Sequence, residues 1–171
     1  MNFVALLIHV YGFNISCSRF DLPEPFVLSD KAAYVTGFKI FKFQLIIKEH
    51  HLDTFGHVNN ATYLQLLEEA RWEFLTNRGF DLKKIHELGE GPIILECHIQ
   101  FLKELGLRQG IIIESQVLSY ERKVGVLRQD ILDGQGVLYC QAKLTFGLFD
   151  MKTRKLILPS SQWLDAIGHS K

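Results

Sequence analysis

The chain has 171 residues, 47% of them hydrophobic, and its 19 basic and 19 acidic residues give a formal net charge of zero. This composition is typical of one domain with a packed core and not of a disordered chain. The balanced charge argues against binding to nucleic acid or to an anionic membrane, because both require clustered positive charge. The three cysteines are Cys17, Cys97 and Cys140. Their odd number and wide spacing argue against a disulfide framework or a zinc site and predict a reducing, cytoplasmic location.

Residues 1–37 are predicted to be an N-terminal extension of unclear role, followed by one domain over residues 38–171. The extension begins with MNFVALLIHVYGF, which is apolar but lacks the basic start and the small-residue cleavage site of a secretory signal. The apolar run is also shorter than the roughly 17–25 residues that span a bilayer, so no stable membrane insertion is expected. The sequence leaves open whether the extension is a packed arm, a weak membrane-facing segment or residues upstream of the true start.

The domain is predicted to begin with a strand and a long helix. Residues 39–48 alternate apolar and polar side chains, which is typical of a half-buried strand. After a polar loop the apolar spacing becomes helical, with Asn59 or Asn60 as the cap and Gly79 as the stop signal. The residues of the wide apolar stripe are Tyr63, Leu64, Leu66, Leu67, Ala70, Phe74 and Leu75.

The second half of the chain is predicted to be nearly all strand. A short helix over residues 81–88 precedes four strands, at residues 93–102, 111–120, 124–132 and 138–148. Asp133 to Gly136 is a hairpin turn signal, a second polar turn covers residues 150–155, and residues 161–168 suggest a closing helix. The strands after Pro92 have no helices between them, which predicts an α+β fold with a long antiparallel sheet curled around the one long helix.

Asp53 is the candidate for chemistry in the loop before the long helix. Gly56 permits a sharp bend there or a close approach by a ligand. The first turn of the helix presents unpaired amides and a positive dipole end. A carboxylate beside oriented N–H donors suits acyl transfer, because the carboxylate attacks or activates water while the amides stabilise the oxyanion.

This stretch resembles the 4-hydroxybenzoyl-CoA-thioesterase-like branch of the hotdog-fold superfamily. The shared pattern is D-x-x-G-x-V-x-[HN]-x-x-Y followed by E-x-A-R. The residues that match it are Asp53, Gly56, Val58, Asn60, Tyr63, Glu68, Ala70 and Arg71. The resemblance covers residues 38–167, including the final turn and strand in FDMKTRKLILP.

The resemblance implies a hotdog fold, in which a curved antiparallel sheet of about five strands wraps a long central helix. It implies a homodimer paired through the sheets, or a homotetramer made of two such dimers. The reaction would be hydrolysis of an acyl-CoA, or of an acyl group on acyl carrier protein, to the free acid and thiol. Asp53 would be the nucleophile or general base, and amides near Asn60 and Ala61 would bind the thioester carbonyl oxygen. No cofactor is expected, since coenzyme A is part of the substrate.

Several neighbouring residues have both a functional and a structural interpretation. His57 either orients Asp53 or the attacking water, or only lies in the loop, and many relatives carry His where this chain has Asn60. Tyr63 and Gly56 are substrate-binding candidates, although Tyr63 also falls on the buried stripe. Glu68 and Arg71 are expected to form an ion pair or an interface bond.

The sequence also has residues that suggest two further kinds of site. Arg122 and Lys123, at a turn between strands, are candidates for the phosphates of coenzyme A, or are only solvated charges. His50, His51 and His57 are not expected to bind a metal, because adjacent histidines in a loop rarely share an ion and no thiolate or second acidic ligand lies nearby.

Two alternative functions remain open from the sequence. One is a hotdog dimer that binds acyl-CoA without catalysis, against which the presence of Asp53 argues. The other is a hotdog enoyl-CoA hydratase or dehydratase, whose differently spaced catalytic histidine and acid are not found here. The acyl group preferred by the chain is not predicted by the sequence.

Overall fold

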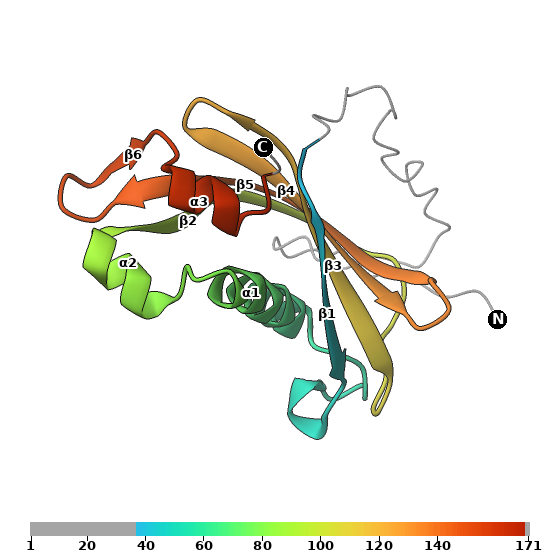
Figure 1. Cartoon of the computed structure of the whole chain (residues 1–171). Helices are drawn as coiled ribbons and strands as arrows, with labels where there is room; N and C mark the ends of the chain where they lie inside the picture. The colour runs from blue at the N-terminus through green and yellow to red at the C-terminus, as the bar shows by residue number, and fades with distance from the viewer. Residues whose placement is uncertain (1–36, 170–171) are drawn as a thin grey trace, which may run out of the picture. The chain divides into compact units, whose positions relative to one another are not determined.

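The computed structural model describes residues 37–169, which form one antiparallel sheet with a long helix against one face (Figure 1). The strands are β1 (Ile40–Ile46), β2 (Glu90–Phe101), β3 (Gly110–Glu121), β4 (Val124–Asp133), β5 (Leu138–Asp150) and β6 (Lys155–Ile157). The helices are α1 (Asn60–Asn77), α2 (Leu82–Leu88) and α3 (Ser161–Ala166), with a 3₁₀ turn at Glu49–His51. The predicted extension lies outside the described residues, apart from Gly37.

The strand order in the sheet is β1-β3-β4-β5-β2, and all neighbours are antiparallel. The short β6 pairs with the end of β5, just beyond the point where β4 begins. The sheet therefore has six strands instead of about five, and the predicted α+β architecture is confirmed. No helix within residues 37–169 is long and apolar enough to cross a membrane.

Helix α1 lies across the concave face of the sheet and fills it with apolar side chains. Tyr63, Leu67, Ala70 and Phe74 are all buried, as the helical spacing predicted. Leu64 is different, since 43% of it is exposed, and its inclusion in the buried stripe was wrong. Successive residues of a helix are about 100° apart, so Leu64 is turned away from the sheet on which Tyr63 packs.

Strand β5 supplies much of the sheet side of the core. Its inward residues from Cys140 to Phe146 and Leu148 are buried, as the alternation predicted, while Leu138 is only partly covered. At the far end, Trp163 of α3 packs edge-on against Phe80 and Phe146. Cys97 and Cys140 are both free thiols.

Candidate active site

Asp53 lies in a tight turn that its own carboxylate stabilises. Oδ1 accepts hydrogen bonds from the amides of Phe55 at 2.8 Å and His57 at 3.4 Å, and the Asp53 amide donates to the His57 carbonyl at 2.8 Å. Gly56 donates to the Asp53 carbonyl at 3.1 Å and has a φ of +82°, a left-handed conformation that favours glycine. The geometry of the turn is therefore enough to explain the D-x-x-G part of the sequence pattern.

The β4–β5 hairpin contains a similar turn around Asp133. Its Oδ1 accepts from the amides of Gln135 at 2.8 Å and Val137 at 2.9 Å. The second oxygen differs: Oδ2 of Asp133 accepts from the Tyr139 hydroxyl at 3.3 Å, whereas Oδ2 of Asp53 has no donor among residues 37–169. The turn alone does not mark a reactive carboxylate, but Asp53 combines this turn with a free oxygen in the loop that leads into α1.

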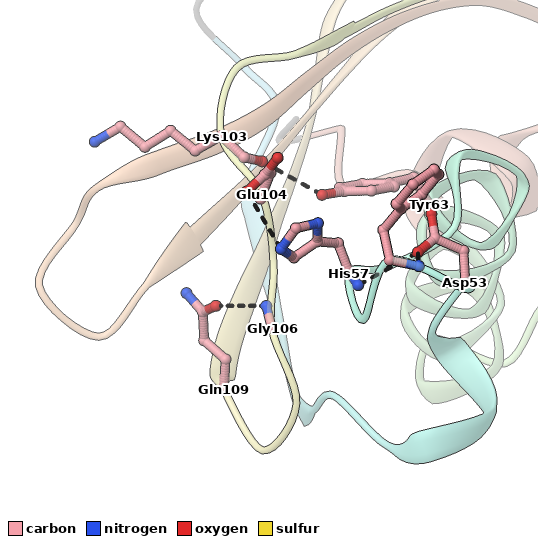
Figure 2. Close-up of polar contacts among 8 residues, drawn as sticks. Asp53, His57, Tyr63, Lys103, Glu104, Gly106 and Gln109 are labelled. Atoms are coloured by element: carbon pink, nitrogen blue, oxygen red, sulfur yellow. Dashed lines mark hydrogen bonds and ion pairs between the residues drawn. The ribbon is translucent and has the colours of Figure 1, made fainter. Parts of the chain in front are cut away.

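Main-chain contacts fasten the Asp53 turn to the connection between β2 and β3 (Figure 2). His57 forms an antiparallel bridge with Gly106, and the Val58 amide donates to the Leu105 carbonyl at 2.9 Å. The Gly106 amide in turn donates to Gln109 Oε1 at 3.1 Å. The position of Asp53 thus depends on a segment about fifty residues downstream.

The side chain of His57 does not bond to Asp53. Its Nε2 lies 3.3 Å from Glu104 Oε2, and Figure 2 shows the imidazole directed at Glu104 while the His57 main-chain amide faces the Asp53 carboxylate. Both side chains are nearly half exposed, so the pair contributes at most about 1 kcal/mol. No spacing signal in the sequence pointed to Glu104, because its partner is reached only through the folded chain.

The start of α1 offers one free amide. Asn59 is the N-cap, and its Oδ1 accepts from the Ala61 amide at 2.9 Å. The Asn60 amide has no acceptor among the described residues, and both Asn60 and Ala61 are exposed. Of the two amides predicted to bind an oxyanion, that of Ala61 is occupied by the cap and that of Asn60 is available.

Tyr63 lies one turn further along α1 and is 4% exposed. Its hydroxyl donates to the Lys103 carbonyl at 3.4 Å, and its ring packs edge-on against Phe101 at 5.0 Å between centroids (Figure 2). Burial raises the pKa of Tyr63 to about 12, so the phenol keeps its proton at neutral pH and acts as a donor instead of a base. Its contact with substrate stays a prediction.

The remaining candidates lie elsewhere. Arg122 and Lys123 occupy the β3–β4 turn, and Lys123 Nζ donates to the Leu156 carbonyl at 2.8 Å. The Asp53 turn lies at the opposite end of β3, a strand that extends roughly 36 Å at about 3.3 Å per residue. The structure therefore does not bring these two cations to Asp53 within one protomer.

The expected ion pair between Glu68 and Arg71 is not formed. Arg71 instead donates from a terminal nitrogen to Gln129 Oε1 at 2.7 Å. Among residues 37–169, no group of three or more His, Cys, Asp or Glu side chains is arranged to hold a metal ion. His51 Nδ1 accepts a hydrogen bond from the Lys48 amide at 3.1 Å.

Residues 48–168 match the family model described as the thioesterase-like superfamily. The chain belongs to this superfamily. A superfamily relative, the long-chain acyl-CoA thioesterase FadM of Escherichia coli, is 34% identical over 116 residues, which is 67% of this chain and 86% of FadM. The predicted membership of a thioesterase family is confirmed.

Solved structures support the same fold. The probable thioesterase YbaW of Escherichia coli is 30% identical with a TM-score of 0.65, over 73% of this chain and 94% of YbaW. The protein SAV2348 of Staphylococcus aureus, solved in complex with CoA, has a TM-score of 0.71 at 19% identity, over 76% of this chain and 82% of its own. These likenesses confirm the predicted hotdog fold.

Gly56→Ala is expected to strain the Asp53 turn. A side chain at a φ of +82° costs about 1–2 kcal/mol, while an added Cβ meets no atom within 4 Å, so the effect is on the backbone alone. Chemical denaturation should therefore show this loss in the free energy of unfolding. Gly106→Ala, in the contacting connection and equally open but without a positive φ, is the matched control and should change stability by less than about 0.5 kcal/mol. Equal effects of both changes would contradict the turn geometry.

Proposed function

We propose that the chain hydrolyses acyl-CoA thioesters, with Asp53 as the catalytic carboxylate and the Asn60 amide as an oxyanion donor. One observation carries the proposal: a carboxylate is held by one oxygen, and its other oxygen and the first amide of the helix that follows have no partner among residues 37–169. A fixed base and a preorganised donor are the two components that acyl transfer to water requires.

The reaction proceeds by addition and elimination at the thioester carbonyl. In one route Asp53 Oδ2 takes a proton from water, and the hydroxide adds to the carbonyl carbon. The oxyanion accepts a hydrogen bond from the Asn60 amide at the positive end of the α1 dipole. Collapse breaks the C–S bond, and the proton on Asp53 passes to the thiolate, which leaves as coenzyme A. In the other route Asp53 itself adds to the carbonyl carbon, and breakage of the C–S bond expels the coenzyme A thiolate and leaves an acyl anhydride on Asp53. Water then hydrolyses this anhydride to the free acid and the Asp53 carboxylate, and the proton released passes to the thiolate.

His57 and Glu104 contribute to the reaction by holding Asp53 in place. The His57 amide bonds to the carboxylate while its imidazole pairs with Glu104, so the pair fastens the reactive turn to the β2–β3 connection. An acyl group on acyl carrier protein is the alternative substrate, and a direct comparison of the two thioesters separates them. A cytoplasmic site of action agrees with the free thiols of Cys97 and Cys140.

The active form is proposed to be a homodimer paired along β2. This twelve-residue strand is an edge of the sheet, hydrogen-bonded only to β5 among the described strands. It exposes large apolar side chains next to exposed apolar residues of α1, which is typical of a protein interface. The exposed residues are Leu64, Trp72, Ile94, Leu95, Phe101 and Leu102. Association of two such dimers would give the homotetramer.

Sedimentation velocity tests the dimer. The mass obtained for the wild type should be twice the 19.7 kDa of one chain for the dimer, or four times that mass for the tetramer. Leu95→Lys places an unpaired charge on the β2 edge and should raise the dimer dissociation constant roughly tenfold or more. Ile46→Lys makes the same change on β1, the other edge strand, where Ile46 is 53% exposed against 46% for Leu95, and should leave the mass unchanged. A monomeric wild type, or dimer loss in Ile46→Lys alone, would contradict pairing through β2.

Turnover of a panel of acyl-CoAs, followed with a thiol-reactive dye, tests the role of Asp53. Asp53→Asn keeps an oxygen that can accept from Phe55 and His57 but removes the base or nucleophile, so kcat/KM should fall roughly 100-fold or more. Asp133→Asn alters a turn of similar geometry and should leave kcat/KM within about twofold. Hydrolysis that survives in Asp53→Asn, or that falls equally in both variants, would overturn the assignment.

A further inference from the structure

Two polar side chains interrupt the apolar inner face of the sheet. Ser115 of β3 and Gln129 of β4 lie directly opposite each other in the strand register, and both are almost completely buried. Ser115 lies between the buried Ile113 and Val117, and Gln129 lies between the buried Leu127 and Ile131. Buried polar groups are costly unless their hydrogen bonds are made, so this pair needs partners.

The partners of Gln129 determine how its amide is oriented. Nε2 donates to the Leu67 carbonyl at 3.0 Å and to Ser115 Oγ at 2.9 Å. Because a carbonyl cannot donate, the nitrogen must face Leu67, and Oε1 must face the other way, toward Arg71 at 2.7 Å. The bond to Leu67 already ties α1 to the sheet, so the helix contact does not require Arg71.

Arg71 is a partly buried cation without a carboxylate partner. No Asp or Glu oxygen among residues 37–169 lies within 4.0 Å of its guanidinium, and Gln129 is its one side-chain acceptor there. Burial lowers the pKa of the Arg71 side chain, and the charge of Glu68 raises it. Gln129 therefore holds one edge of the guanidinium, and its other N–H groups remain available as donors.

Arg71 also lines an apolar pocket of about 100 Å³ between α1 and the sheet. Arg71 and Glu68 are its charged residues. The apolar walls include Trp72, Ile94, Val117, Leu127, Phe146 and Trp163. A pocket lined mostly by apolar side chains with a few fixed polar groups is typical of a small-molecule site.

The proposed dimer would place this pocket beside the reactive turn. Ile94 lies near the start of β2, and the Asp53 turn is anchored at residues 103–106, just after the end of β2. In an antiparallel β2 pair the start of one strand lies beside the end of the other. The pocket of one protomer then adjoins Asp53 of the partner subunit.

We infer that this pocket receives the acyl group of the substrate and that Arg71 selects acyl groups bearing an oxygen acceptor at their far end. The inference rests on the proposed thioesterase function. A guanidinium donates and does not accept, so the selected group is a hydroxyl, a keto or a carboxylate oxygen. Gln129 is the positioning residue that aims Arg71, and an acyl chain ending in a methyl group gives the remaining N–H groups of the guanidinium no acceptor.

The test compares paired acyl-CoAs of six to twelve carbons, each with a terminal methyl, hydroxyl or carboxyl group. At the chain length that reaches Arg71, the wild type should show a kcat/KM roughly 10- to 100-fold higher for an oxygen-bearing substrate than for the methyl-ended one. Arg71→Met should abolish that ratio by lowering turnover of the oxygen-bearing substrate only. Arg71→Lys keeps a donor and the charge and should retain part of the preference. This variant separates loss of the donor from a folding defect in the Met variant.

Arg78→Met is the matched control, because Arg78 is the C-cap residue of the same helix, lies outside this pocket and bonds to the Asp165 carbonyl. It should leave the ratio unchanged. A ratio that is unaffected by Arg71→Met at every length, with hydrolysis still dependent on Asp53, overturns the role of Arg71 and leaves the thioesterase function standing. If no thioester is hydrolysed, the function fails, and affinities for non-hydrolysable thioether analogues test Arg71 by the same ratio.

Discussion

The two oxygens of the Asp53 carboxylate have different roles, one in the structure of the turn and the other in the proposed reaction. Oδ1 accepts from two amides and stabilises the turn, and Oδ2 has no donor in the described part of the chain. The other parts of the site hold this carboxylate in position. The glycine at φ +82° makes the turn possible, Asn59 begins the helix, and the β2–β3 connection keeps turn and helix in place. Asp133 has a similar turn with its second oxygen occupied, and Asp150 has one whose second oxygen also has no donor among residues 37–169. Asp53 differs from both because its free oxygen lies in the loop that leads into α1.

Local periodicity predicted most of the fold. Helix α1 and strand β5 were recognisable because each buries one face, and burial imposes a period of 3.6 or 2 residues. Long-range contacts leave no such period, and for that reason the Glu104 partner of His57 was not predicted. The exposure of Leu64 was missed because its apolar character reflects a surface that a second chain is proposed to cover.

The role of Gln129 was also not predicted, although the sequence contains a signal for it. Gln129 lies between Leu127 and Ile131, in a strand whose inward positions are otherwise apolar, and Ser115 opposes it on the neighbouring strand. A polar residue at a core position predicts a buried hydrogen-bond network. Here the network reaches Arg71 and the pocket, so the same helix that begins at the reactive turn also carries the residue proposed to select the acyl group.

The most direct test of the account is a crystal structure of the Asp53→Asn variant with an intact acyl-CoA bound. The thioester carbonyl oxygen should lie about 2.7–3.1 Å from the Asn60 amide nitrogen. The free side-chain atom of residue 53 should approach the carbonyl carbon to about 3–3.5 Å, or reach it through one water. A thioester bound away from the start of α1, or a carbonyl oxygen held by other donors with residue 53 out of reach, would contradict the central claim.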